Sequence, residues 1–144
     1  MIESIADLAR ATLDGHIVLR RSLASAGHYP PIDVLESVSR LMERVSSEPH
    51  RESARAIRQL LAAHAEARDL IAIGAYVRGS DPLTDRAVDL SPRINAFLRQ
   101  AASEVTPFDS AVAALQSIDP ENPFAPEPAD DHDPETLAAP GETP

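Results

Sequence analysis

Seven residues near the middle of the chain recur at spacings of three and four, the periodicity of one face of an amphipathic helix. The residues at this spacing are Ile57, Leu60, Leu61, His64, Ala65, Arg68 and Ile71. Ser47 stands before Glu48 and Pro49, an order that is favoured where a helix begins. Gly74 suits the left-handed backbone at a helix end. The pattern predicts one long helix between Ser47 and Gly74.

Two shorter helices are predicted further along the chain. Asp81 and Pro82 favour a helix start, as the N-cap and the first helical residue. Pro92 is expected to break or restart this helix, because proline lacks the backbone N–H and clashes with the preceding turn. The residues expected to face inward on the segment that runs on to residue 102 are Ile94, Phe97 and Leu98. Pro107-Phe-Asp opens a last helix over 109–118, with Val112 and Leu115 on it.

The first third of the chain has shorter patterns. Residues 3–12 fit a short helix, and an Asp-Gly turn then leads to residues 16–19, where Ile and Val favour a strand. Residues 20–26 fit a second helical segment that Gly27 ends. A Pro-Pro pair then forces extended backbone, and residues 32–42 are expected to be extended or irregular.

These elements predict a mainly α fold with a small α/β part. Residues 1–45 have the character of strands and helices from the edge of an α/β sheet, and residues 46–118 that of a small helical bundle. Residues 119–144 contain seven Pro and eight Asp or Glu but no Arg or Lys, a composition that predicts a disordered acidic tail. The isolated α/β part is expected to expose a sheet edge and apolar surface.

Composition excludes several classes of function. The formal charge of −10 lies mostly in the tail, because the rest of the chain has 13 Arg against 15 acids, a net charge of −2. Nothing therefore points to nucleic acid as a partner. The absence of Cys excludes disulfides and thiolate catalysis. No apolar run approaches the ~20 residues of a membrane span, and the N-terminus lacks the pattern of a signal peptide.

The residues that could contact a nucleotide are Tyr29 and Arg40. Tyr29 stands beside the Pro-Pro pair, where a fixed backbone suits a ring that stacks on a base; the alternative is a ring packed on the prolines. Arg40 follows small residues and could present its fork to phosphate oxygens; the alternative is an ion pair with Glu36 or Glu43. The chain has no Gly-x-x-x-x-Gly-Lys-[Ser/Thr] loop and no Lys at all, so it lacks the part that cradles phosphates.

Metal and acid–base sites are not predicted. The chain's histidines are not arranged as metal ligands; His16 is better read as a hydrogen-bonded structural residue, and His132, among the tail acids, would make a weak metal site at best. Asp14 is read as a turn residue. Asp33 could order the backbone or pair with an Arg, and no general-base role is supported for either carboxylate.

Five collinear segments resemble the C-terminal third of the flagellar and type III secretion export ATPases, relatives of the catalytic and regulatory subunits of rotary ATP synthases. The segments cover roughly residues 3–100 and are Ile5-Ala-Asp-Leu-Ala-Arg-Ala-Thr-Leu-Asp-Gly-His-Ile-Val-Leu19, Gly27-His-Tyr-Pro-Pro-Ile-Asp33, Ser37-Val-Ser-Arg-Leu-Met42, Ala67-Arg-Asp-Leu-Ile-Ala-Ile-Gly-Ala-Tyr76 and Gly79-Ser-Asp-Pro82. The chain departs from the family at Arg20, where Ser is usual, and at Pro31, where Ala is usual. The family's N-terminal barrel, P-loop, metal-binding Asp and catalytic Glu would lie before Met1. We therefore expect a piece of a longer protein or a shortened relative.

The resemblance implies roles for individual residues. Tyr29 matches the aromatic residue that lies against adenine, and Arg40 matches the arginine finger that acts in trans on the nucleotide of the neighbouring subunit. Phe108 falls near a second adenine-contacting aromatic; the alternative is a core residue in the first turn of the last helix. Tyr76 and Arg78 lie on the loop that resembles the stalk-contacting loop of rotary relatives; the alternative is an ordinary loop between helices.

The function implied is the C-terminal part of an ATPase that energises flagellar or type III protein export. The complete protein would use ATP with Mg²⁺ and form a homo-oligomeric ring, expected to be a hexamer, in the cytoplasm and peripheral to the export gate of the inner membrane. Its partners would be a stalk protein, chaperones and export substrates. This chain alone is predicted to bind no nucleotide strongly and to be inactive. The alternative is a non-enzymatic helical module that binds a stalk or an export chaperone, helix in groove.

Overall fold

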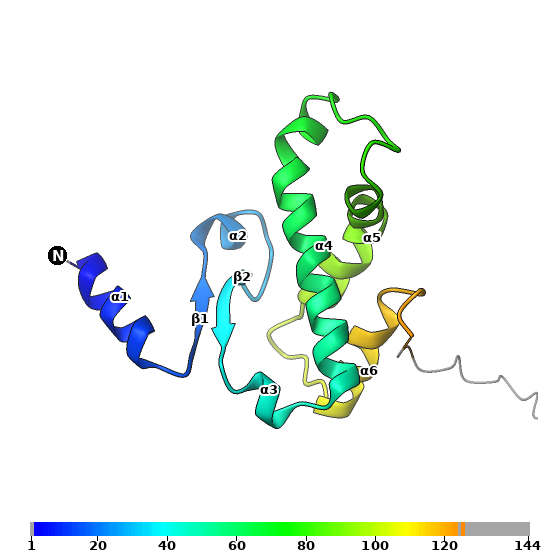
Figure 1. Cartoon of the computed structure of the whole chain (residues 1–144). Coiled ribbons are helices and arrows are strands. Elements are labelled where there is room, and N and C mark those ends of the chain that lie inside the picture. Colours follow the sequence, from blue (N-terminus) through cyan, green and yellow to red (C-terminus); the bar gives the residue numbers. More distant parts are fainter. Residues whose placement is uncertain (1, 124, 126–144) are drawn as a thin grey trace, which may run out of the picture.

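The computed structural model of the chain describes residues 2–123 and 125. This part is mainly helical with one small sheet, as the sequence predicts (Figure 1). Its elements in order are α1 (Ile2–Thr12), β1 (Gly15–Leu19), α2 (Arg21–Ser25), β2 (Ile32–Ser39), α3 (Met42–Val45), α4 (Glu48–Ala72), α5 (Pro82–Leu98) and α6 (Phe108–Ser117). No helix in the described ranges is long and apolar enough to cross a membrane.

The apolar core lies where α4 packs against α5 and against α6 (Figure 1). Its buried residues are Ile57, Leu60, Ala63, Ala87, Leu90, Ile94 and Ile118, with Leu61, Phe97, Leu98 and Leu115 packed against them. The predicted stripe is right at Ile57, Leu60 and Leu61, but Ala65 and Arg68 are exposed. The buried face continues through Ala63 and Ala67 instead. The inward orientation predicted for Ile94, Phe97 and Leu98 is confirmed.

Local sequence determines where α4 and α5 begin and end. Ser47 precedes α4 as predicted, but its side chain makes no capping hydrogen bond. Gly74 follows α4 with a φ of 69°, the left-handed backbone that glycine adopts without strain. The Asp81 carboxylate accepts hydrogen bonds from Leu83 N (3.3 Å) and Thr84 N (3.1 Å), so its predicted role as N-cap of α5 is confirmed.

The prediction that Pro92 breaks or restarts the second helix is wrong, as is the extension to residue 102. Helix α5 runs through Pro92 and ends at Leu98. Pro92 is exposed, whereas Leu90 and Ile94 on either side of it are buried against the core. Packing of this buried face on α4 therefore outweighs the hydrogen bond that the proline removes.

The first third of the chain forms a two-stranded antiparallel sheet that packs beside α4 (Figure 1). The helix, turn and strand predicted over residues 3–19 are confirmed as α1, a bend and β1. The segment 32–42 is extended as β2 up to Ser39, and α3 begins at Met42. Helix α1 extends away from the sheet, and its Ile5 and Leu8 side chains are largely exposed.

The predicted tail differs from the structure at its start. Asp119 is buried and forms an ion pair with Arg86 (2.5 Å), and Asn122 Nδ2 donates to Ser53 Oγ (2.9 Å). The first residues of the predicted tail therefore belong to the helical bundle. Sequence composition could not reveal this, because the partners Arg86 and Ser53 are distant in the chain. The rest of the predicted tail, with His132, lies outside the described residues, except for residue 125.

Candidate functional site

Strand β2 separates the two residues predicted to contact nucleotide. Tyr29 precedes the strand and Arg40 follows it directly. The ends of β2 are paired with Leu19 and Gly15 of β1, which are about 13 Å apart at a rise of about 3.3 Å per residue. Tyr29 and Arg40 therefore lie toward opposite ends of β2, and the structure does not bring them together around one point.

Tyr29 is held through its backbone and leaves its ring accessible. Its carbonyl oxygen accepts a hydrogen bond from Gln100 N (2.8 Å), which ties it to the segment after α5. The adjacent His28 is buried, and its Nδ1 donates to the carbonyl of Pro30 (3.1 Å). The Tyr29 residue is nevertheless 56% exposed. Such an arrangement leaves aromatic surface free for stacking.

Arg40 has an anchored backbone and an exposed side chain. Its N–H donates to the carbonyl of Asp14 (2.8 Å), which extends the pairing of β1 and β2. The alternative in which Arg40 pairs with Glu36 or Glu43 is wrong. Glu36 pairs with Arg20, Glu43 pairs with residues of α4, and among the described residues no carboxylate pairs with Arg40.

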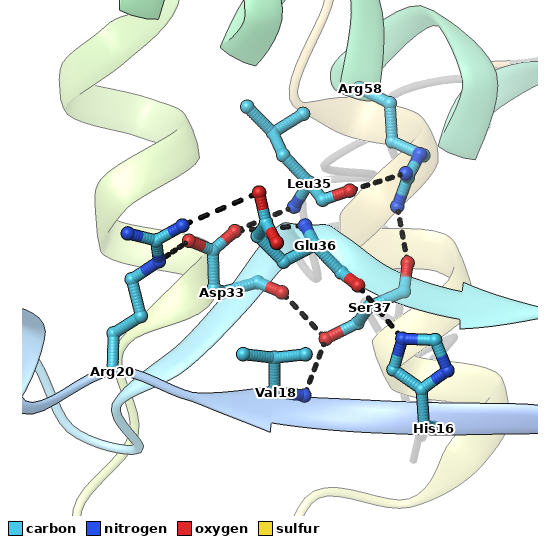
Figure 2. A network of polar contacts seen from close by, with 8 residues as sticks. All are labelled: His16, Val18, Arg20, Asp33, Leu35, Glu36, Ser37 and Arg58. Carbon is cyan, nitrogen blue, oxygen red and sulfur yellow. Dashed lines mark hydrogen bonds and ion pairs between the residues drawn. The ribbon is translucent and has the colours of Figure 1, made fainter. Parts of the chain in front are cut away.

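Between these two residues, β2 carries a large bulge. His16 pairs with Val38 and Val18 pairs with Asp33, so one residue of β1 stands opposite four residues of β2, numbers 34–37. The bulge begins at Asp33, whose Oδ1 accepts from Leu35 N and Glu36 N (3.0 Å each). Its carboxylate also pairs with Arg20. Both roles predicted for Asp33, ordering the backbone and pairing with an Arg, are confirmed (Figure 2).

The rest of the bulge is held by side chains from three elements (Figure 2). Ser37 Oγ donates to Asp33 O (2.5 Å) and accepts from Val18 N (3.0 Å). The Nε2 of His16 lies 3.2 Å from Glu36 O and donates to it, which confirms the structural role predicted for His16. Arg58, from α4, donates to Val34 O, to Leu35 O (3.1 Å) and to Ser37 O (3.3 Å). Sequence reasoning missed Arg58, because its partners are backbone carbonyls that no residue pattern marks.

The structure places Phe108 at another part of the molecule. Phe108 begins α6, is 71% exposed and makes an edge contact with His50, with ring centroids 5.9 Å apart. The alternative in which Phe108 is a core residue is therefore wrong. His50 lies in the first turn of α4. The part of α4 near Tyr29 is eleven residues further on, at Leu61, which lines one cavity with His28 and Ile32 on either side of Tyr29 in the chain. At 1.5 Å per residue this is a separation of about 16 Å along α4.

Tyr76 and Arg78 lie on the connection between α4 and α5 and are both bonded to α5. Tyr76 Oη donates to Asp85 Oδ1 (2.8 Å), and Arg78 donates to both oxygens of Asp89 (2.9 and 2.6 Å). Partial desolvation, and then the bond to Asp85, raise the pKa of Tyr76; the bond to Asp89 raises the pKa of Arg78. Between them Val77 is exposed. The connection is thus an ordered tip that presents an apolar residue.

Across the described ranges, no group of three or more His, Cys, Asp or Glu residues could hold a metal ion. The described residues therefore offer an exposed ring at Tyr29 and an exposed guanidinium at Arg40, at separate places, and no set of ligands for Mg²⁺.

Comparison with known proteins assigns both parts of the chain. Residues 46–117 match the model of the type III secretion ATPase EscN C-terminal domain, and residues 1–39 match the nucleotide-binding domain of the ATP synthase alpha/beta family. The chain belongs to the flagellar and type III secretion export ATPase family. The matches end at residue 39 and resume at residue 46, so Arg40 falls between them.

Members of the family from several bacteria are similar over most of this chain. It is 48% identical over 118 residues to the flagellum-specific ATP synthase of Salmonella typhimurium, covering 82% of this chain and 26% of that protein. It is 51% identical over 116 residues to the type 3 secretion system ATPase of Sinorhizobium fredii, covering 81% and 26%. The chain therefore spans about a quarter of the length of these curated relatives.

A solved structure of the same family supports the fold. The assembled ATPase EscN of enteropathogenic E. coli, in complex with its central stalk EscO, matches with a TM-score of 0.75 and 35% identity, covering 79% of this chain and 28% of that one. The resemblance identified from the sequence motifs is therefore confirmed, and the chain corresponds to a C-terminal segment of such an ATPase.

Proposed function

We propose that this chain supplies the C-terminal segment of an ATPase that energises flagellar or type III protein export. The observation that carries the proposal is Arg40, an exposed guanidinium with an anchored backbone and no ion-pair partner among the described residues. An Arg held in this way is available to a negatively charged group outside the chain. The sequence match to export ATPases supports identifying that group as the phosphates of a nucleotide.

Tyr29 and Arg40 would serve two different nucleotides. Their separation along β2 supports this, because one residue precedes the strand and the other follows it. Tyr29 would stack on the adenine of its own subunit, an interaction worth about 1–3 kcal/mol per base. Arg40 would reach the γ-phosphate at the neighbouring subunit, where such fingers contribute about 10³–10⁵ in rate. This division requires a homo-oligomeric ring, and the assembled state of EscN agrees with it.

Phe108 remains a candidate for a second adenine contact only if the nucleotide or the helices lie differently in the assembled ring. Its large exposed ring is consistent with contact to another molecule. Its contact with His50, far along α4 from the residues beside Tyr29, favours a partner other than the same adenine.

The chain by itself would not hydrolyse ATP. It has neither a P-loop nor any Lys, and residues 2–123 offer no cluster that could hold Mg²⁺. An arginine can neutralise part of the phosphate charge and a tyrosine can stack on the base. Without a P-loop, however, the chain has no backbone cradle that binds the β- and γ-phosphates. The complete ATPase would act on the cytoplasmic side of the inner membrane, next to the export gate.

The tip between α4 and α5 would contact the stalk. Hydrogen bonds from Tyr76 and Arg78 to α5 fix the tip, and Val77 is left exposed on it. The relative EscN is solved with its central stalk EscO. This observation also supports the second candidate, a helical module that binds a stalk or an export chaperone without ATP hydrolysis. Val77→Asp should weaken stalk binding under either proposal, so only nucleotide turnover separates them.

Turnover is best measured in a grafted subunit. This is the flagellum-specific ATP synthase of S. typhimurium with its matching segment replaced by residues of this chain. We expect the grafted subunit to hydrolyse ATP, and Arg40→Ala to lower kcat by about 10³ or more with little change in KM. Tyr29→Ala should chiefly raise KM, whereas Tyr29→Phe should not. Turnover that survives Arg40→Ala would refute the assigned role, and hydrolysis by the 144-residue chain alone would refute its dependence on other segments.

A further inference from the structure

The bulge in β2 is held by many hydrogen bonds although it lies outside the strand pairing. Four consecutive residues, 34–37, are looped out of the pairing with β1, so their backbone groups have no ladder partners there. Backbone groups that leave a strand ladder are paired instead with side chains or with water. The side chains that satisfy them show what the bulge is attached to.

Most of these side chains belong to the sheet itself. Asp33 accepts from the amides of Leu35 and Glu36, and His16 donates to the carbonyl of Glu36. The remaining three carbonyls, of Val34, Leu35 and Ser37, all accept from Arg58. In this network Arg58 alone comes from the helical bundle, 21 to 24 residues further along the chain (Figure 2).

Arg58 is suited to this task by its chemistry and its position. A planar guanidinium presents several donors in a fixed fork, whereas a Lys ammonium is a compact point charge on a flexible stem. Arg58 stands beside Ile57 and two residues before Leu60, both buried in the core, so its backbone moves with the bundle. Within the described part of the chain no carboxylate pairs with Arg58, so its guanidinium donates to the three carbonyls without competition from an ion pair.

The bulge leads directly to Arg40. Ser37, whose carbonyl Arg58 holds, is three residues before Arg40, and Arg40 N is bonded to Asp14 O. A displacement of α4 relative to the sheet would therefore pull on the segment that ends at Arg40. We propose that Arg58 is a positioning residue that couples the helical bundle to the strand carrying Arg40. The coupling to turnover rests on the proposed function of Arg40; the attachment itself does not.

The attachment is tested by amide hydrogen exchange on the 144-residue chain. In Arg58→Met, the amides of residues 34–40 should exchange about tenfold faster or more, while those of the α4–α5 core are unchanged. Arg55→Met is the matched control, because Arg55 is one turn earlier on α4 and, among the described residues, pairs only with Glu43 and Glu52. It should leave residues 34–40 unchanged. Unchanged exchange of residues 34–40 in Arg58→Met would overturn the proposal. If Arg58→Met also removes protection from the core, the milder Arg58→Lys is measured instead, and its exchange rates at residues 34–40 should lie between those of the wild type and Arg58→Met.

The coupling is tested in the grafted subunit. Arg58→Met should lower kcat about tenfold or more with KM unchanged, and Arg58→Lys should restore part of the loss. The double variant Arg40→Ala with Arg58→Met should be no slower than Arg40→Ala alone, because Arg58 acts through Arg40. Additive losses would show that Arg58 acts elsewhere and would overturn the coupling. If Arg40→Ala itself leaves turnover intact, the proposed function fails, while the exchange experiment still decides whether Arg58 holds the bulge.

Discussion

Arg20 forms an ion pair with Asp33, and its guanidinium also reaches Glu36 Oε1 at 3.3 Å. Arg20 stands directly after β1, at the position where the family usually has Ser, so this chain adds a charge next to the start of the bulge. The Arg20 side chain is 48% exposed, and water screens its ion pairs. The ion pairs of Arg20 therefore add little to the stability of the bulge, and we expect the bulge to form without them.

Replacing Arg20 by the usual family residue should therefore have a small effect. We expect Arg20→Ser to lower the free energy of unfolding by less than about 1 kcal/mol, the range of exposed ion pairs. Urea unfolding followed by circular dichroism measures the difference, and the effect should shrink at high salt. A loss well above 1 kcal/mol that persists at high salt would mean that Arg20 is required for the bulge.

Asp33 should matter more than Arg20. Its side chain is mostly buried and accepts two amide hydrogen bonds, so Asp33→Ala leaves the N–H groups of Leu35 and Glu36 without this acceptor. We expect a destabilisation of about 1–3 kcal/mol, because two hydrogen bonds that each contribute about 0.5–1.5 kcal/mol are lost. Asp33→Asn is the control, because an amide oxygen can still accept both bonds while the ion pair with Arg20 is lost. Equal losses in the two variants would assign the effect to the charge and contradict this account.

The helices and their ends follow from local sequence. The N-cap residue Asp81, the first-turn Pro82 and the terminal Gly74 act on their immediate neighbours, so their effect is visible in the chain itself. The prediction of a break at Pro92 is wrong because the local penalty of the proline competes with burial of Leu90 and Ile94 against another helix. Tertiary packing determines that the helix continues through Pro92, and local sequence rules take no account of tertiary packing.

The candidate site was only partly predictable for the same reason. The resemblance pointed to Tyr29 and Arg40 through short motifs, and Asp33 was recognised as a residue that orders backbone. The bulge was not foreseen, because its register depends on pairing between β1 and β2 and on Arg58 from α4. Arg58 stands next to the apolar stripe, and in the sequence it resembles any solvated Arg of an amphipathic helix.

Acid should weaken the start of α5 through Asp81. Hydrogen bonds, first that from the Thr84 hydroxyl and then those from backbone amides, hold the pKa of Asp81 below its ordinary value of 3.8. A carboxyl whose pKa is lower in the folded state stabilises the fold above its unfolded pKa, and this contribution is lost as the pH falls through the folded pKa. Stability should therefore contain a component that disappears on acidification below about pH 4.

Asp81→Asn isolates that component, because its amide oxygen can cap α5 without titrating. We expect the wild-type chain to lose more stability than Asp81→Asn between pH 6 and pH 3, approximate limits chosen to bracket the carboxyl titration. Urea midpoints at several pH values measure the difference. Parallel pH profiles for the two chains would show that the Asp81 carboxylate is not stabilised by folding.

Two truncations should separate the end of the bundle from the acidic segment beyond it. Ending the chain after Ile118 removes Asp119, which is buried and bonded to Arg86 (2.5 Å), and Asn122, which donates to Ser53 Oγ. Loss of this charge-assisted contact leaves Arg86 without its buried partner and should destabilise the bundle by about 1–3 kcal/mol. Ending the chain after residue 125 keeps both contacts and should leave the Tm unchanged.

The variant Asp119→Asn in the whole chain is the control for the shorter truncation. It removes the Asp119 charge but keeps Glu121, the second carboxylate that pairs with Arg86, so it should reproduce most of the loss if the Arg86–Asp119 pair carries the effect. If truncation after Ile118 leaves the Tm unchanged, residues 119–123 merely lie on the bundle. If truncation after residue 125 also lowers the Tm, the contacts of Asp119 and Asn122 do not account for the whole contribution of the C-terminal segment. Comparing the two truncated chains thus locates the residue after which the chain no longer stabilises the bundle. The sequence composition predicts this boundary after Ile118.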